Sequence, residues 1–252
     1  MSYDSPMSRV IAVIPARFGA SRFPGKPLAL LLGKPMVEHV WRRCEEARCF
    51  DEMVVATDDP RISAAVAAFG GKAELTSAAC RSGTDRVAEL ARLKAGAGDD
   101  VFVNVQGDEP AIHPSCLNAL VKAFEQPSVA MATLVRPLEE AERANPNVVK
   151  VVRDERSYAL YFSRHDIPYP QEPGISRWAH LGIYGYRRQT LLRLAELPPT
   201  LLEQAESLEQ LRALGNGIRI LCAETTHRSQ AVDVPADLQL AEACLRRLLA
   251  SG

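Results

Sequence analysis

Three positively charged side chains, Arg17, Arg22 and Lys26, lie within ten residues near the N-terminus, in a stretch that also contains two glycines. This basic loop (residues 15–27) directly follows five apolar residues, 10–14, which indicate a strand buried on both faces of a parallel sheet. Cations and glycines at the carboxyl end of such a strand suit an anionic ligand, most often a phosphate. A basic surface loop without a ligand is the alternative.

The basic loop differs from the phosphate-binding loop of Walker-type kinases and ATPases. Five residues separate its glycines, where that motif has four, and Pro27 follows Lys26, where the motif has Ser or Thr. The hydroxyl group that would bind Mg²⁺ is therefore missing, and the pattern disfavours a Walker-type enzyme.

Asp108 offers a second kind of chemistry. It follows the apolar stretch 101–105, and a carboxylate at the carboxyl end of a central parallel strand lies where α/β folds place their ligands. Mg²⁺ is usually held by one or two carboxylates together with substrate phosphates, so Asp108 could hold Mg²⁺ against phosphates bound by the basic loop. An Asp-Glu-Pro turn is the alternative. Asp58 and Asp59 are interpreted as turn and helix N-cap residues, not as metal ligands.

The first half of the chain predicts a parallel sheet. Apolar stretches at 10–14, 53–57 and 101–105 alternate with helical patterns, which is typical of strands joined by crossover helices. We expect one helix to begin at 33–35, with Pro35 in its first turn. A second helix would follow 80–86, capped by Thr84.

After residue 137 the pattern changes. The stretches 148–152 and 158–162 predict an antiparallel hairpin, and 180–186 predicts a further strand. A helix over 202–214 and a strand over 218–222 follow. We therefore expect a single α/β domain over residues 1–252, with a mostly parallel, doubly wound sheet. A smaller antiparallel lobe, approximately residues 140–200, would bind an acceptor and pair two subunits.

Composition narrows the protein class. The formal net charge of −1 gives no basic field that would attract nucleic acid, and 47% of the residues are hydrophobic, as in ordinary globular proteins. The six cysteines are scattered without a Cys-x-x-Cys pair, so neither zinc nor a disulfide framework is indicated. No stretch has the length of a membrane span, and residues 1–9 lack the apolar core of a signal peptide. We expect a cytoplasmic protein that does not insert into membranes.

Six separate motifs between Ile14 and Leu238 resemble the 3-deoxy-manno-octulosonate (Kdo) cytidylyltransferase family. They include the basic loop, Val103–Pro110, Tyr158–Arg164, His180–Tyr186, Glu206–Arg212 and the Val-Asp-x-Pro sequence around Asp233. The resemblance implies a fold of the nucleotide-diphospho-sugar transferase type. It also implies transfer of CMP from CTP to the anomeric hydroxyl of Kdo, giving CMP-Kdo and pyrophosphate for lipopolysaccharide synthesis. Mg²⁺ would be the cofactor, CTP and Kdo the substrates, and a homodimer the assembly.

The resemblance also assigns roles to particular residues of this chain. The catalytic residues would be Asp108, Lys26 and Arg17. Asp108 and Asp233 would bind the metal. The nucleotide would contact Arg17, Ser21, Lys26, Ser82, Gly83, Thr84, Arg86 and Gln106. The acceptor sugar would contact Gln106, Arg164, His180, Tyr184, Glu209 and Gln210. Cys80 stands where the family has His, and the loop 168–177 is shorter than the family pattern.

Two other functions remain open from the sequence. A cytidylyltransferase for another keto-sugar acid, 8-amino-Kdo or a sialic acid, would use the same basic loop and Asp108. A non-catalytic nucleotide-sensing protein would tolerate the loss of Asp108. For Arg164, we expect the rigid guanidinium to meet the carboxylate of the sugar. A structural ion pair with Asp166 or Glu172 is the alternative.

Overall fold

The computed structural model describes residues 8–19, 22–94, 99–169, 171 and 174–250. Its centre is a nine-stranded sheet with the path β11-β7-β10-β6-β1-β4-β5, to which β8 and β9 attach through β10. Strand β1 (Val10–Ala16) lies parallel to both β4 (Glu52–Thr57) and β6 (Val101–Asn104), and β4 lies parallel to β5 (Ala73–Leu75). The predicted α/β fold with a parallel sheet is confirmed in this half.

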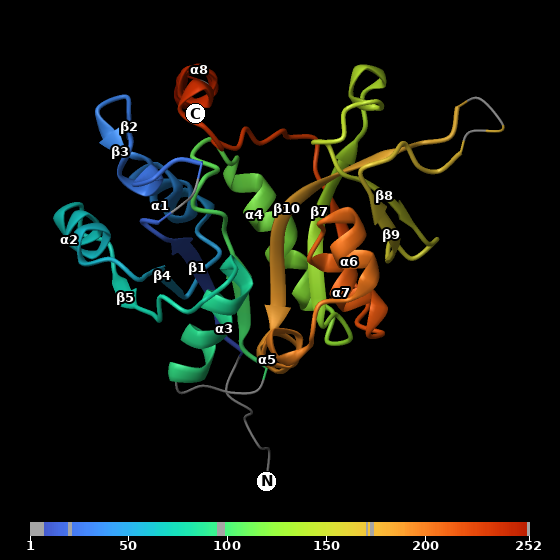
Figure 1. Ribbon diagram of the computed structural model, residues 1–252, viewed down its shortest axis with the longest axis horizontal. Coiled ribbons are helices and arrows are strands. Elements are labelled where there is room, and N and C mark those ends of the chain that lie inside the picture. The colour runs from blue at the N-terminus through green and yellow to red at the C-terminus, as the bar shows by residue number, and fades with distance from the viewer. Residues whose placement is uncertain (1–7, 20–21, 95–98, 170, 172–173, 251–252) are drawn as a thin grey trace, which may run out of the picture.

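The other half of the sheet is mixed. Strand β10 (Trp178–Arg187) runs antiparallel between β6 and β7 (Met131–Pro137), while β11 (Leu221–Glu224) lies parallel to β7. The hairpin of β8 (Lys150–Arg153) and β9 (Ala159–Ser163) was predicted correctly; it joins the first residues of β10. One strand therefore passes from the hairpin into the parallel half of the sheet (Figure 1).

Helices cover both faces of the sheet. On one face α1 (Met36–Ala47), α2 (Pro60–Ala68) and α4 (Pro114–Lys122) bury apolar side chains against the strands. On the other face lie α3 (Gly83–Leu93), α5 (Arg188–Glu196) and α7 (Gln210–Gly215). This arrangement is the expected doubly wound architecture. No helix in the described ranges is long and apolar enough to cross a membrane.

The C-terminal part returns to the first half of the chain. Residues 225–234, here called the strap, run from β11 across the sheet to the 3₁₀ turn η4 (Pro235–Asp237) and to α8 (Leu238–Ala250) (Figure 1). Helix α8 packs Ala241 and Leu245 against the small hairpin of β2 (Leu30–Leu31) and β3 (Lys34–Pro35). The remaining 3₁₀ turns are η1 (Lys26–Leu28), η2 (Ala123–Glu125) and η3 (Glu140–Glu142).

Outside the site, three predicted boundaries differ clearly from the structure. Pro35 pairs within the β2–β3 hairpin, and α1 begins at Met36. The single helix expected over 202–214 is two helices, α6 (Leu201–Glu206) and α7, because Ser207 adopts a left-handed conformation (φ 53°) that turns Leu208 into the core. The last strand begins at Leu221, because the carbonyl group of Ile220 accepts the N–H of Ala159 outside a regular ladder.

Candidate active site

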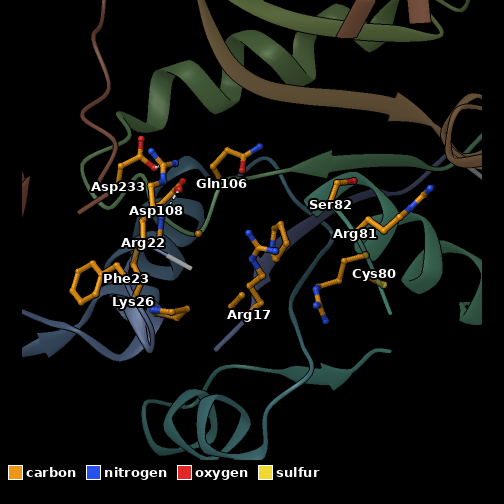
Figure 2. Close-up of a pocket in the computed structure, with 16 residues that line it drawn as sticks. Arg17, Arg22, Phe23, Lys26, Cys80, Arg81, Ser82, Gln106, Asp108 and Asp233 are labelled. Atoms are coloured by element: carbon orange, nitrogen blue, oxygen red, sulfur yellow. Dashed lines mark hydrogen bonds and ion pairs between the residues drawn. The ribbon is translucent and has the colours of Figure 1, made fainter. Parts of the chain in front are cut away.

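A pocket opens at the carboxyl ends of β1 and β6 (Figure 2). Arg22, Phe23 and Lys26 of the basic loop line one side of the pocket together with the two aspartates. Residues 80–83, before and at the start of α3, line the other side, and Arg17 lies between the two. Of the residues predicted from the sequence, this pocket brings together Arg17, Lys26, Ser82, Gly83, Arg86, Gln106, Asp108 and Asp233.

Close backbone contact determines where Asp108 lies. A Cβ atom built on the preceding residue, Gly107, would lie 2.6 Å from the carbonyl oxygen of Pro15, so only glycine fits. The basic loop is closed by Gly25, whose N–H donates to the carbonyl of Phe18 at 2.8 Å and whose φ of 72° favours glycine. The last residues of β1 and β6 are therefore held against each other by main-chain atoms.

Lys26 and Asp108 form a largely buried ion pair. The Lys26 Nζ atom lies 2.7 Å from Asp108 Oδ2 and 2.8 Å from the carbonyl oxygen of Val232 in the strap. The N–H of Val232 in turn donates to the carbonyl oxygen of Asp108 at 2.9 Å. The strap is thus fixed to the end of β6, and this brings Asp233 into the pocket.

Asp233 has weaker partners. Its Oδ1 atom accepts from Arg22 at 2.9 Å. The Arg22 side chain is 68% exposed and that of Asp233 is 47% exposed, so this ion pair adds little to the stability of the fold. Its backbone N–H and that of Val234 donate to Asp237 Oδ2 at 2.8 and 3.0 Å. These two bonds lower the pKa of Asp237.

The donor set suits Mg²⁺ bound together with a nucleotide. Within the described ranges, no cluster of three His, Cys, Asp or Glu side chains could hold a metal ion by itself. Asp108 and Asp233 line the same pocket as two carboxylates. Since Mg²⁺ needs only one or two carboxylates when phosphate oxygens complete its shell, the residues fit such a metal.

The remaining cationic side chains of the pocket differ in the hydrogen bonds and ion pairs that they form with the protein. In the part of the chain that the structure describes, the exposed Arg17 has no hydrogen bond or ion pair. Arg86 is buried and bonded to Thr76 Oγ1 (2.5 Å) and to Asp58 Oδ2 (2.9 Å), so it shapes the wall of the pocket. Arg81, which we did not predict, pairs with Asp85 four residues later. In total, five cationic side chains and two carboxylates line the pocket.

The start of α3 corrects one prediction. Ser82, not Thr84, caps the helix: Ser82 Oγ accepts the N–H of Asp85 at 3.1 Å. Thr84 is buried and does not line the pocket. The helix begins earlier than expected because Gly83 already belongs to its first turn. Ser21 lies outside the described residues.

Cys80 is a neutral thiol in the pocket wall. Its Sγ atom donates to Glu89 Oε2 at 2.9 Å, and the other oxygen of Glu89 accepts the N–H of Ser77 at 2.8 Å. Burial and the nearby Glu89 raise the pKa of Cys80 to about 11. The thiol therefore stays protonated near neutral pH and is a poor nucleophile.

The predicted acceptor residues form a second group, which does not line this pocket apart from Gln106. Gln106 Nε2 donates to the carbonyl of Gly182 at 3.1 Å and so connects the end of β6 to β10.

Strand β10 contains a bulge next to this contact, since its pairing with β7 shifts between Leu181 and Tyr184. His180 precedes the bulge and Tyr184 follows it, and their rings lie on the α7 face with centroids 5.4 Å apart. Glu209 lies close enough to raise the pKa of Tyr184 further, beyond the effect of burial, and Gln210 is buried at the start of α7.

His180 is held neutral in a defined tautomer. Burial lowers the pKa of His180 to about 3. Its Nε2 atom lies 2.9 Å from Thr133 Oγ1, whose single proton is directed to the carbonyls of Leu181 and Ile183. In the tautomer that leaves this proton with one of the carbonyls, the hydroxyl oxygen accepts from Nε2–H and His180 Nδ1 is an acceptor.

Arg164 is bonded mainly to main-chain carbonyls. Its Nε donates to Glu206 O at 2.8 Å and its Nη1 to Pro146 O at 2.9 Å. The ion pair with Asp166, our structural alternative, is absent from the described contacts, because Arg143 and Arg177 occupy that carboxylate. Glu172 lies outside the described residues.

Comparisons with known proteins agree with this geometry. A family model described as cytidylyltransferase matches residues 11–220. The 3-deoxy-manno-octulosonate cytidylyltransferase of Myxococcus xanthus (strain DK1622) is 58% identical over 241 residues, covering 94% of this chain and 97% of that protein. The Escherichia coli protein of the same name is 46% identical over 248 residues, covering 98% and 100%.

A solved structure gives the same result in three dimensions. The structure of CMP:2-keto-3-deoxy-manno-octonic acid synthetase complexed with CTP superposes with a TM-score of 0.90 at 44% identity, covering 95% of this chain and 99% of that one. A putative glucose-1-phosphate thymidylyltransferase from Bacillus anthracis, at 18% identity and a TM-score of 0.65, shares the fold alone. The chain therefore belongs to the cytidylyltransferase family and, within it, to the 3-deoxy-manno-octulosonate cytidylyltransferases.

Proposed function

We propose that this protein transfers CMP from CTP to the anomeric hydroxyl of Kdo, giving CMP-Kdo and pyrophosphate. The observation that carries the proposal is the pocket that five cations line together with the Asp108 and Asp233 carboxylates. A triphosphate carries negative charge that such a surplus of cations neutralises, and close relatives bear the name of this activity. Use of the product in lipopolysaccharide synthesis follows from the same assignment.

Arg17 and Lys26 would hold the triphosphate. In the described part of the chain Arg17 has no protein partner to give up, and it lies between the two walls of the pocket (Figure 2). Lys26 already faces the pocket through its bond to Asp108. The sugar hydroxyl would attack the α-phosphorus in line, and positioning with charge neutralisation would supply most of the rate enhancement.

We propose Mg²⁺ as the cofactor, with Asp108 and Asp233 as its protein ligands. When bound, it would neutralise phosphate charge and orient the reactants. Lys26 and Arg22, which occupy the two carboxylates in this structure, would then be released toward the phosphates.

The acceptor group would bind the sugar. His180 Nδ1 is free to accept from a hydroxyl, since Nε2–H is committed to Thr133. Glu209 and Gln210 would bind further hydroxyl groups of the sugar. Arg164 would bind the sugar carboxylate with those guanidinium N–H groups that do not donate to main-chain carbonyls. Gln106 lies between the pocket and the acceptor group.

Pyrophosphate release from CTP, Mg²⁺ and Kdo tests the proposal. We expect release with Kdo and little with 8-amino-Kdo or a sialic acid. Faster release with either of those sugars would assign the protein to the alternative keto-sugar acid. No release with any acceptor would favour the nucleotide-sensing alternative.

A homodimer formed through residues 140–200 and a cytoplasmic location are further proposals, which rest on the family resemblance. Light scattering during size-exclusion chromatography tests the first, and cell fractionation tests the second.

A further inference from the structure

The strap carries one of the two pocket carboxylates but contributes no regular strand or helix at that point. Val232 is anchored by its buried side chain and by its two main-chain bonds, to Asp108 and to Lys26. Asp233 follows immediately, and its only described side-chain bond is the exposed contact with Arg22. Since an exposed pair of this kind orders a side chain weakly, something else must fix the backbone of Asp233.

Asp237 supplies that constraint. One of its oxygens, Oδ2, accepts both the N–H of Asp233 (2.8 Å) and the N–H of Val234 (3.0 Å). Bonds from N–H groups to a carboxylate are stronger than bonds between neutral groups. Asp237 itself does not line the pocket. Asp237 therefore constrains the backbone of Asp233 from a position outside the pocket.

We propose that Asp237 is a positioning residue, which fixes the main chain of Asp233 so that its carboxylate lies beside Asp108 on the same side of the pocket. The inference rests on the proposed function, in which these two carboxylates bind Mg²⁺. Residues that orient metal ligands from behind typically change metal affinity about 10–100-fold when they are replaced. The competing role for Asp237 is that of an ordinary cap at the start of η4 and α8, which would affect stability alone.

The two roles separate in a binding experiment on the whole chain. Mn²⁺ binding to the complex of enzyme and CTP is measured by water-proton relaxation, and CTP affinity is measured separately in EDTA. We expect Asp237→Ala to weaken Mn²⁺ binding at least about tenfold and to leave CTP affinity in EDTA within about twofold. Asp237→Asn keeps the shape of the side chain and one carbonyl oxygen. This variant should therefore lose less Mn²⁺ affinity than Asp237→Ala and remain folded.

Asp59→Ala is the matched control. Asp59 caps α2 in a similar way, accepting the N–H of Arg61 at 2.9 Å, and it does not line the pocket. This variant should lower the melting temperature without changing Mn²⁺ affinity. If Asp237→Ala and Asp237→Asn behave like it, with lower melting temperatures and wild-type Mn²⁺ affinity, the positioning role is overturned.

Asp233→Asn distinguishes failure of the inference from failure of the proposed metal site. If Asp233→Asn weakens Mn²⁺ binding and the Asp237 variants do not, only the positioning role is wrong. If Asp233→Asn also leaves Mn²⁺ affinity unchanged, the assignment of Asp233 as a metal ligand is wrong, and the positioning role with it.

Discussion

Two cations of the pocket, Lys26 and Arg22, and two of residues 140–200, here called the lobe, Lys150 and Arg164, differ in the partners that they contact. In the lobe, Lys150 is fully buried and donates to the carbonyls of Asn145 and Arg164, while Arg164 donates to those of Glu206 and Pro146. In the pocket, Arg22 contacts the carboxylate of Asp233, and Lys26 contacts the carboxylate of Asp108 in addition to the carbonyl of Val232. Main-chain carbonyls cannot leave without unfolding the lobe, whereas a carboxylate can exchange its cation for a metal. Lys150 and Arg164 therefore maintain shape, whereas Lys26 and Arg22 remain available for a ligand.

The largest expected effect comes from removing a pocket carboxylate. Asp108→Asn should reduce turnover at least about a hundredfold at saturating Mg²⁺, the scale on which a single preorganised electrostatic contact acts. The melting temperature should change little, because the amide has the same shape. Asp59→Asn makes the same charge change outside the pocket and should keep full activity. Wild-type turnover of Asp108→Asn would contradict the metal role.

Arg164→Lys tests whether a lobe cation also serves the substrate. We expect KM for Kdo to rise at least about tenfold, since a hydrogen bond to a charged group contributes roughly 1.5–3 kcal/mol, while KM for CTP stays nearly constant. The melting temperature should also fall, because one ammonium group cannot replace the guanidinium at separated carbonyls. Arg143→Lys, in the same lobe, serves as the control. A lower melting temperature with both KM values unchanged would make Arg164 purely structural.

His180 tests whether the acceptor region is kept uncharged. The folded protein lowers the pKa of His180 from 6.5 to about 3, so below pH 6.5 the unfolded chain binds a proton that the folded chain does not. This contribution to stability is complete above pH 6.5 and is lost as the pH falls toward 3. Urea unfolding of wild type and His180→Gln at pH 7.5 and 5 should show a steeper acid loss for wild type, approaching about 1.4 kcal/mol per pH unit. Equal slopes would contradict the neutral state of His180 in the folded protein.

The smallest effect is expected at Cys80. A serine hydroxyl can donate to Glu89 as the thiol does, so Cys80→Ser should change kcat/KM for CTP less than about tenfold. Cys80→Ala removes the donor and serves as the comparison. An inactive serine variant would mean that the thiol itself takes part in the reaction.

Local patterns predicted the parallel half of the fold and the pocket well. The apolar residues 10–14, four of which are buried, precede Arg17, and Asp108 follows the buried strand β6 after a short turn; both patterns place functional side chains at strand ends. The sequence did not reveal that Ser207 breaks the helix over 202–214, because no glycine marks its left-handed turn. Nor did it reveal the role of Asp237, since its bonds to Asp233 and Val234 depend on how the strap folds back on itself.

The bulge in β10 determines which substitutions, insertions and deletions are compatible with the pairing of the sheet. A Cβ atom built on Gly182 would meet no atom within 4 Å, so a larger side chain is sterically possible there. Deleting Gly182 is different: since side chains alternate along a strand, the loss of one residue would transfer His180 and its N-terminal neighbours to the opposite face. Tyr184 would stay in place through its pairing with Asn104. We expect this point of the chain to tolerate substitutions while rejecting single-residue insertions and deletions.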